Sequence, residues 1–235
     1  MTQPNIQRYA RSIGALYVVL FVLGPMVFLF GKGAVLVPDD PAATAANVRA
    51  MGEGYRRGVG IEAAIFLIEV LLSGLLYVVF RPVNRGIALA ASLARFGEAV
   101  VQGANVLPAL LVITLAAGGA AVESFSPAQQ DALIHLFQQA NAGIVLVWGL
   151  FFGLHVVLLG SLVYGSGFLP RWLGVLLLLA GIGYLAQSLG VLLVPSSAAF
   201  LDGLVVVMAV PGELAFTLWL LVKGVNAEDW VARAA

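Results

Sequence analysis

The sequence predicts an all-α membrane protein, a polytopic bundle of six transmembrane helices. Hydrophobic residues make up 61% of the chain, charged residues only 10%, and the mean hydropathy is +1.02. Soluble domains average about 25% charged residues, so this chain has too few polar side chains to cover a surface in water. Its apolar runs are about 18 residues or longer, which is enough to cross a ~30 Å hydrocarbon layer. The surplus apolar area is therefore expected to face lipid.

The six apolar runs form a single predicted transmembrane domain over residues 1–235. Proline accounts for several features of these runs: Pro25 is expected to kink the first, Pro82 to end the second, and Pro108 to bend the outer third of the third. Ser196 or Ser197 can cap the last. The predicted spans are about 13–30, 58–80, 86–117, 142–164, 172–194 and 201–222.

Short interfacial helices are predicted in the two outer loops. Asp40 followed by Pro41 is a typical helix start, and the helix should continue to about Met51. The segment Ser126-Pro-Ala-Gln129 has the pattern of a capping box. An amphipathic helix follows it, which is expected either to lie at the membrane interface or to extend the fourth span.

Charge and cysteine content exclude several classes of function. Twelve basic and twelve acidic residues balance, so there is no electrostatic case for binding nucleic acid. Cysteine is absent, which excludes disulfides, thiolate catalysis and iron–sulfur clusters. The two histidines, His135 and His155, lie about 30 Å apart along a continuous helix, so bis-histidine haem ligation within one subunit is not expected. No cofactor is predicted.

The distribution of basic residues predicts that both termini lie in the cytoplasm. With the N-terminus inside, seven basic residues fall on the cytoplasmic side and four on the outside. Arg56 and Arg57, on the outside, argue mildly against this orientation. The cytoplasmic set is Arg8, Arg11, Arg81, Arg85, Arg171, Lys223 and Arg233, and the outer set is Lys32, Arg49, Arg56 and Arg57.

Five ionisable residues of the predicted spans share one depth. They lie about 9–12 residues from the cytoplasmic helix ends, or ~14–18 Å along a helix. Polar residues of several spans also repeat at helical spacing, which indicates that they face an interior. The five residues, here called the ionisable cluster, are Glu69, Arg95, Glu98, His155 and Glu213. The sequence thus predicts a buried polar pocket near the midplane.

The charges of the ionisable cluster do not balance. It has three carboxylates but one arginine, and a charged side chain at a helix centre costs about 2.5–3.5 kcal/mol. Arg95 is expected to hold Glu98, three residues further along the helix. The remaining carboxylates should be protonated, share protons with His155, or bind a cation. This is the physical case for a ligand- or proton-handling site.

Further polar residues have both a functional and a structural interpretation. Four are candidates to line the pocket: Gln102, Trp148, Gln187 and Thr217. Taken singly, Gln102, Asn105, Gln187 and Thr217 are expected only to bond neighbouring helices. His135 is expected to be a surface histidine, and Glu62 to meet water or Arg57 near the outer boundary. A metal site formed by His155, Glu98 and Glu213 is chemically feasible, but no metal-binding spacing supports it.

Several short motifs of the sequence resemble those of the DUF4386 family of bacterial membrane proteins. They include Phe152-Gly-Leu-His155, Ser166-Gly-Phe-Leu-Pro-Arg171, Arg95-Phe-Gly-Glu98 and Gly212-Glu213. The resemblance implies a six-span protein of unassigned role in the bacterial cytoplasmic (inner) membrane. It also implies that Arg95, Glu98, His155 and Glu213 belong to the family pattern.

Three functional hypotheses follow. The first is binding or transport of a small amphipathic or cationic ligand, coupled to protonation of the ionisable cluster, with Arg95 orienting the site. The second is an intramembrane enzyme that uses His155 with Glu98 and Glu213 as acid, base or metal ligands. The third is a structural or regulatory membrane subunit. The expected partners are the lipid bilayer, a small-molecule ligand and a second copy of the chain.

Overall fold

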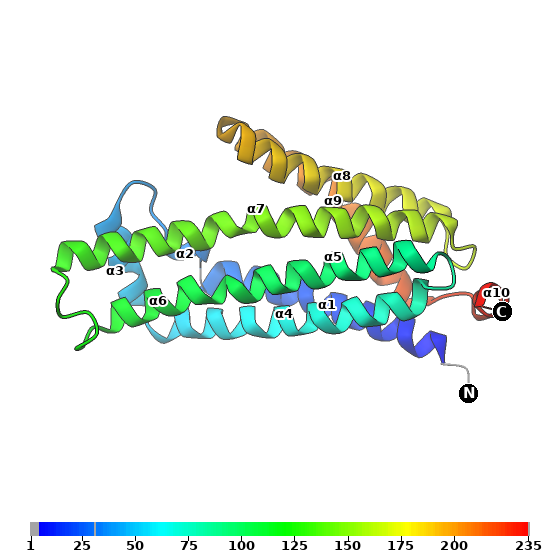
Figure 1. Ribbon diagram of the computed structural model, residues 1–235, viewed down its shortest axis with the longest axis horizontal. Coiled ribbons are helices and arrows are strands. Elements are labelled where there is room, and N and C mark those ends of the chain that lie inside the picture. The colour runs from blue at the N-terminus through cyan, green and yellow to red at the C-terminus, as the bar shows by residue number, and fades with distance from the viewer. Residues whose placement is uncertain (1–4, 31, 235) are drawn as a thin grey trace. The chain divides into compact units, whose positions relative to one another are not determined.

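The computed structural model of the protein, which describes residues 5–30 and 32–234, is 86% helical and has no strand among these residues (Figure 1). Six helical segments are long and apolar enough to cross a membrane, which confirms the predicted fold class. The elements are α1 (Ile6–Phe30), α2 (Lys32–Val35), α3 (Pro41–Met51), α4 (Glu53–Phe80), α5 (Arg85–Ala104), α6 (Val106–Ala117), α7 (Pro127–Gly165), α8 (Arg171–Leu193), the 3-10 turn Pro195–Ser197, α9 (Ala198–Val222) and α10 (Ala227–Ala234).

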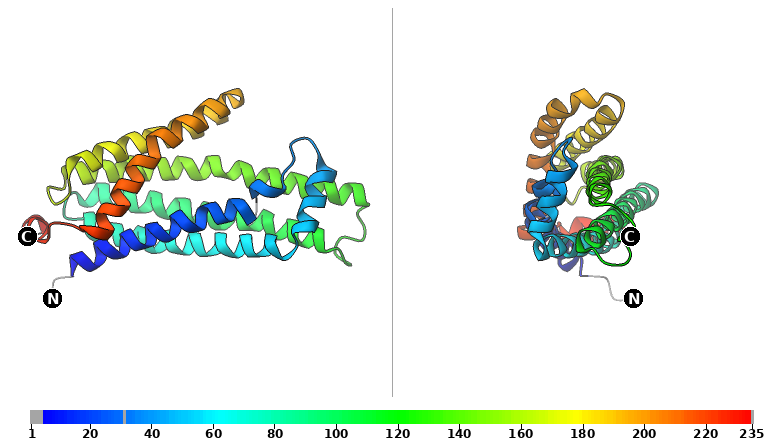
Figure 2. Two further views of the ribbon diagram at one scale, coloured as in Figure 1. Left: turned by 180° about the vertical axis from the view of Figure 1, so that it is seen from behind. Right: turned by 90° about the vertical axis from the view of Figure 1, so that its left-hand side faces the viewer.

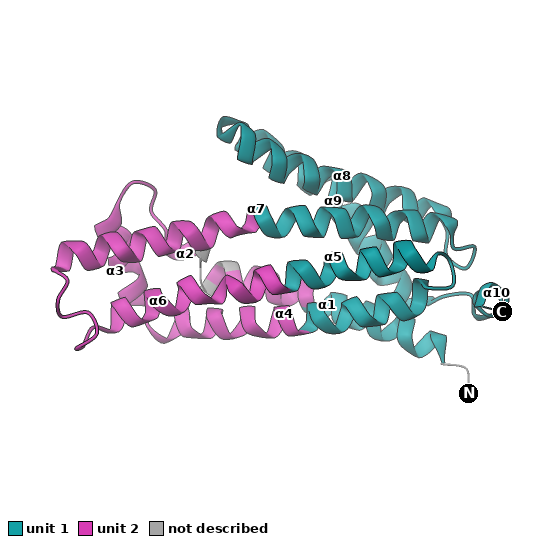
Figure 3. Cartoon of the chain, viewed as in Figure 1, with its two compact units in different colours: residues 1–19, 68–99, 146–235 teal, residues 20–67, 100–145 magenta. Residues whose placement is uncertain are grey.

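The helices form two compact units, coloured separately in Figure 3. Unit 1 comprises residues 1–19, 68–99 and 146–235, and unit 2 comprises residues 20–67 and 100–145. Helices α1, α4, α5 and α7 each contribute residues to both units. Large apolar side chains are widely exposed, with Leu193 at 79% and Phe200 and Val207 at 72%. Apolar exposure on this scale is typical of surfaces that face lipid.

Unit 1 is built on the contact between α8 and α9, which lie side by side, and on the second half of α7 (Figure 2). Two reciprocal glycine pairs join α7 to α8. A β-carbon on Gly174 would lie 2.8 Å from the Gly160 carbonyl oxygen, and one on Gly160 would lie 3.0 Å from the Gly174 carbonyl oxygen. Gly153 and Gly181 repeat this relationship at 3.1 and 2.8 Å. The missing side chains let the two backbones approach closely.

The ends of the membrane helices in unit 1 are also joined. Gln7, in the first turn of α1, donates from Nε2 to the carbonyl oxygen of Val225 over 2.6 Å. The Val225 amide in turn donates to Gln7 Oε1 over 3.3 Å. Val225 lies between α9 and α10, so this paired bond ties the start of the first span to the residues that follow the last.

Unit 2 has an apolar core shared by α2, α3, α4, α6, the loop before α7 and the first half of α7. Its members come from segments far apart in the sequence and are almost completely buried: Val35, Ala45, Val48, Tyr55, Ala109, Val112, Leu115, Val122 and Ile134. The amphipathic residues 127–141 are part of α7, so they extend the fourth predicted span instead of forming a separate interfacial helix.

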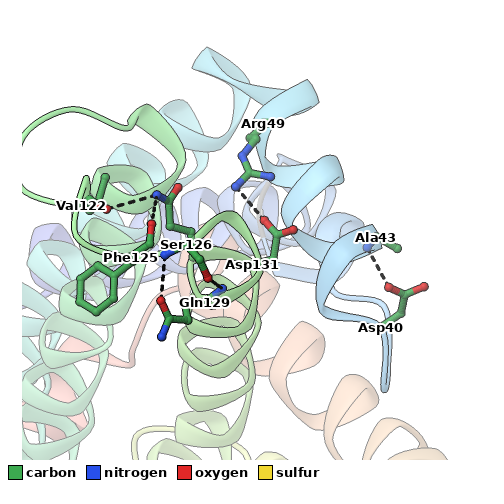
Figure 4. Close-up of polar contacts among 9 residues, drawn as sticks. Asp40, Ala43, Arg49, Val122, Phe125, Ser126, Gln129 and Asp131 are labelled. Atoms are coloured by element: carbon green, nitrogen blue, oxygen red, sulfur yellow. Dashed lines mark hydrogen bonds and ion pairs between the residues drawn. The ribbon is translucent and has the colours of Figure 1, made fainter.

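The helix starts in unit 2 have the caps that the sequence predicts (Figure 4). Asp40 Oδ1 accepts a hydrogen bond from the Ala43 amide at 2.9 Å, with Pro41 in the first turn. Ser126 and Gln129 form the reciprocal capping box, at 2.8 and 3.3 Å. The prediction that Ser197 caps the last span is wrong. Its hydroxyl donates to the carbonyl oxygen of Val194, three residues earlier, and makes no cap bond.

The third predicted span is divided at Asn105 into α5 and α6. Pro108 has no amide hydrogen and its ring crowds the carbonyl four residues earlier, so the regular hydrogen-bond ladder is interrupted there. Asn141 Nδ2 donates to the Asn105 carbonyl oxygen at 2.9 Å. A side chain of α7 therefore bonds to a backbone carbonyl near the interruption. Inside a membrane no water is available to make such a bond.

Candidate functional site

The site in unit 1 is centred on a buried ion pair within α5. Arg95 and Glu98 are three residues apart on an alanine-rich helix, so their side chains lie on one face. Arg95 Nε is 3.2 Å from Glu98 Oε1, and the two side chains are 2% and 0% exposed. Neither carboxylate oxygen of Glu98 accepts an aligned hydrogen bond from a described residue. The pair is therefore held by charge and leaves acceptor capacity on Glu98.

Two aromatic rings flank the Arg95 guanidinium. Its central carbon lies 5.1 Å from the ring centre of Tyr17 on α1 and 5.4 Å from that of Phe152 on α7. Arg95 Nη1 also donates to the Tyr17 hydroxyl over 3.5 Å. Rings at this distance attract a cation through their electron-rich faces. Arg95 is thus fixed by three helices of unit 1.

Two more carboxylates act on this pair. Glu69, on α4, is 4% exposed, and Glu213, on α9, is partly buried. Both interact electrostatically with Arg95 and with Glu98. Tyr184 of α8 also interacts electrostatically with Glu213. The structure thus brings all three predicted carboxylates into the electrostatic range of one arginine.

His155 lies in the same unit and is completely buried. Its Nδ1 is 2.8 Å from the Ala91 carbonyl oxygen. A carbonyl only accepts hydrogen bonds, so Nδ1 carries the proton and Nε2 has the free lone pair. No described residue hydrogen-bonds to Nε2. His155 also interacts electrostatically with Arg95.

An aromatic group adjoins His155 along α7. Trp148 stacks on Phe152 with ring centres 4.7 Å apart, and Tyr184 meets Phe152 edge-on at 4.8 Å. Phe152 in turn lies 6.2 Å from the His155 ring. The Trp148 indole nitrogen has no hydrogen-bond partner among the described residues. Trp148 thus lies beside the ionisable cluster, with an unused donor.

The other predicted pocket residues are divided between the units. Thr217 is buried in unit 1, at 2% exposure. Gln187 donates to the exposed Asp202 carboxylate at 2.9 Å, so its amide is bound to the neighbouring helix α9. Gln102 lies in unit 2 and donates to Glu62 Oε1 at 3.0 Å. It therefore belongs to a different polar group from the ionisable cluster.

That second group, here called the amide cluster (Glu62, Gln102, Asn105 and Asn141), was not predicted. Glu62 was expected to meet water or Arg57, but it is 2% exposed and accepts from Gln102 and, at 3.2 Å, from Asn105 Nδ2. Arg57 is exposed and donates to the Glu53 carbonyl oxygen instead. The sequence feature that could have indicated this cluster is the polar residues that interrupt the apolar run near Pro108.

The surface position predicted for His135 is also wrong. His135 is 7% exposed, and its Nδ1 is 3.0 Å from the Thr44 hydroxyl of α3. Beside it, Tyr55 donates from its hydroxyl to Gln138 Oε1 at 2.8 Å. Helix α3 covers the first half of α7, and this contact withdraws the imidazole from solvent. The sequence around His135 is amphipathic but does not indicate which element covers it.

A three-residue metal site is not formed in the part of the chain that the structure describes. No three His, Asp or Glu side chains there are grouped closely enough to hold an ion. His155, Glu98 and Glu213 thus share an electrostatic environment without forming a ligand set. Two described cavities, of about 390 and 230 Å³, are lined by other residues.

Comparisons with known proteins identify relatives but assign no activity. The sequence profile described as "Domain of unknown function (DUF4386)" matches residues 12–224. An uncharacterized protein of Archaeoglobus fulgidus is 31% identical over 116 residues, which are 49% of this chain and 56% of that protein. The chain thus spans just over half the length of this curated relative. No solved structure matches it.

Proposed function

We propose that this chain, which belongs to the DUF4386 family of unknown function, binds a small cationic or amphipathic ligand at its ionisable cluster and exchanges that ligand with protons across a membrane. The observation that carries the proposal is the buried Arg95–Glu98 pair, which has a further carboxylate, Glu213, within electrostatic range.

The charge imbalance supports a cationic ligand. Arg95 is engaged by Glu98, and Glu213 adds a further carboxylate within electrostatic range of the same arginine. Carboxylates taken out of water either accept protons or attract a cation, because an uncompensated charge there is costly. A ligand that carries positive charge would compensate them in the same way as protons do.

The aromatic group supports the amphipathic part of the ligand. The rings of Trp148, Phe152 and Tyr184 contact one another within unit 1, beside His155. Aromatic faces attract organic cations and also bury apolar groups. Carboxylates together with stacked rings are the combination that recognises cations with apolar substituents.

Proton exchange follows from the same groups. Protons and a cationic ligand would compete for Glu98 and Glu213, so the affinity for the ligand should rise with pH until both carboxylates are ionised. His155 has an acceptor nitrogen at Nε2 that can take a proton during the exchange. Arg95 would keep the carboxylates oriented between the two states.

The test uses tetraphenylphosphonium, an amphipathic cation, as the probe. Its binding to the purified protein in lipid nanodiscs is measured by equilibrium dialysis between about pH 5 and pH 8. In the wild type, affinity should increase with pH. In the double variant Glu98→Gln and Glu213→Gln, affinity should fall roughly tenfold at the upper pH, and its pH dependence should disappear.

The matched control removes two exposed carboxylates, through Glu123→Gln and Glu228→Gln. This control should bind as the wild type does. Equal, pH-independent binding by the Glu98 and Glu213 variant would refute the proposal. If that variant lost thermal stability but bound the probe as the wild type does, the result would favour the structural-subunit hypothesis. A stoichiometric metal found by elemental analysis would favour the enzyme hypothesis.

We also propose that both ends of the chain face the cytoplasm of a bacterial inner membrane. The seven basic residues assigned to that side by sequence all belong to unit 1, and the four outer ones all belong to unit 2. This asymmetry in basic residues supports the assignment of the side with seven to the cytoplasm. The exposed apolar faces would contact lipid, with a second copy of the chain as the alternative occupant.

The chain has no cysteine, so orientation can be tested with single-cysteine variants. Asn84→Cys places a thiol between α4 and α5, and Glu123→Cys places one between α6 and α7. A membrane-impermeant maleimide should label only Glu123→Cys in intact cells and both variants after permeabilisation. If only Asn84→Cys were labelled in intact cells, the orientation would be the opposite of the one proposed.

A further inference from the structure

A second candidate site lies at one end of unit 1, where α10 covers the turn between α4 and α5. It is a cavity of about 390 Å³, here called the arginine pocket, and its volume is in the range of small-ligand pockets. The residues that line it are Tyr77, Arg81, Pro82, Arg85, Trp230, Arg233 and Ala234. All of them belong to unit 1, and none belongs to the ionisable cluster.

Helix α10 is fixed in place by hydrogen bonds. Trp230, 4% exposed, donates from its indole nitrogen to the Val79 carbonyl oxygen at 2.8 Å. Arg233 Nη2 donates to the Gly165 carbonyl oxygen at 3.0 Å. The Asn226 amide, just before the helix, donates to the Phe168 carbonyl oxygen at 3.1 Å. The wall of the pocket that α10 supplies is therefore built into the fold.

The charged side chains that line the pocket are all positive. Arg81, Arg85 and Arg233 are all exposed to solvent, and none pairs with a carboxylate among the described residues. Two acidic residues of α10, Glu228 and Asp229, do not line the cavity. Three arginines thus line a cavity to which no acidic side chain of the described residues contributes. Such an arrangement attracts a multivalent anion.

The position of the pocket adds a second constraint. Arg81 directly follows the last residue of the second membrane helix, and Arg85 is the first residue of the third. Arg81 and Arg85 are therefore placed where apolar helices end, which is where a spanning helix would meet lipid headgroups. The planar fork of arginine matches the oxygens of a phosphate group, and basic pockets at this level bind phospholipid headgroups.

We propose that the arginine pocket binds a phosphate group, supplied either by an anionic phospholipid headgroup or by a soluble phosphate. Arg81 and Arg85 would contact the phosphate oxygens directly. Arg233 would contribute its remaining guanidinium hydrogens, and Trp230 would hold α10 over the bound group. This site is independent of the function proposed for the ionisable cluster.

Binding to the full chain in detergent is measured by microscale thermophoresis with three probes. Dioctanoyl phosphatidylglycerol tests a lipid source, inorganic phosphate tests a soluble source, and dioctanoylglycerol, which lacks the phosphate, is the matched lipid control. At least one phosphate probe should bind the wild type, and dioctanoylglycerol should not. The double variant Arg81→Gln and Arg85→Gln should bind that probe at least tenfold more weakly.

The control variant, Arg8→Gln and Arg11→Gln, removes the same charge from exposed residues at the start of α1. It should retain wild-type affinity, which separates a site from general electrostatic attraction. If the Arg81 and Arg85 variant does not fold, Arg85→Gln alone and the charge-retaining Arg85→Lys replace it, and both should weaken binding. Failure of both phosphate probes to bind, or equal loss in the control, would overturn the proposal.

Discussion

The carbonyl oxygen of Gly160 lies where a side chain on residue 174 would have to fit, because a β-carbon on Gly174 would approach it to 2.8 Å. That β-carbon would also lie 2.5 Å from the backbone nitrogen of Tyr164. Backbone atoms cannot move aside as a flexible side chain can. The separation of α7 and α8 is thus limited by backbone contact.

Gly174→Ala should therefore destabilise the protein by about 1–3 kcal/mol, the usual cost of forcing extra atoms into a close-packed contact. The free energy of unfolding can be measured by titration with sodium dodecyl sulfate in mixed micelles. Gly74→Ala is the matched control, because a β-carbon on Gly74 meets no atom within 4 Å. Its stability should equal or exceed that of the wild type by up to about 1 kcal/mol. A similar loss in both variants would contradict the close contact.

Removing Arg95 alone should be severely destabilising. Arg95→Ala would leave Glu98 buried without its cation, and the loss of one partner from a buried pair costs about 3–5 kcal/mol. The double variant Arg95→Met and Glu98→Gln removes both charges and should recover most of that loss. The same detergent titration measures both. A double variant as unstable as Arg95→Ala would mean that the pair itself does not account for the effect.

The side chain of Asn141 should have a measurable structural role in unit 2. Asn141→Ala would leave the Asn105 carbonyl without the hydrogen bond that it accepts at 2.9 Å. Interhelical hydrogen bonds in membranes contribute about 0.6 kcal/mol on average and up to about 1.7, so the expected loss of unfolding free energy lies in that range. Gln139→Ala, at an exposed position two residues earlier, is the control and should be neutral. Equal effects of the two substitutions would exclude the role.

The capping box at the start of α7 should control local fraying. Ser126→Ala removes the hydroxyl that accepts from the Gln129 amide, which should cost about 1 kcal/mol and accelerate exchange of that amide. Hydrogen exchange followed by mass spectrometry on the peptide containing Gln129 measures the effect. Ser196→Ala, at an exposed position before α9, should leave that peptide unchanged. Unchanged exchange in Ser126→Ala would show that the cap is not needed.

Hydropathy was sufficient to predict the six spans, because lipid requires every spanning segment to be long, apolar and internally hydrogen-bonded. It placed the start of the first span too late. Helix α1 begins at Ile6, where Ile6, Ala10 and Ile13 repeat at helical spacing and are buried. Their polar neighbours lower the average hydropathy of this turn, so only periodicity could have indicated it.

Burial of single polar residues was harder to predict than the spans. Glu62 and His135 bond to Asn105 and Thr44, which lie 43 and 91 positions away in the sequence, and no local pattern identifies those partners. Helix α10 was also not predicted, although Asn226 caps it, acidic residues follow and Arg233 lies in its last turn. These are ordinary helix signals, but the segment is too short and polar to stand out beside membrane spans.

The paired bond between Gln7 and Val225 constrains how often the chain crosses the bilayer. Two residues that share hydrogen bonds at 2.6 and 3.3 Å must lie on the same side of the membrane. The number of crossings between them is therefore even, whichever compartment that side faces. A protein fused to one end of the chain would accordingly share its compartment with one fused to the other, close enough for energy transfer between two fluorophores.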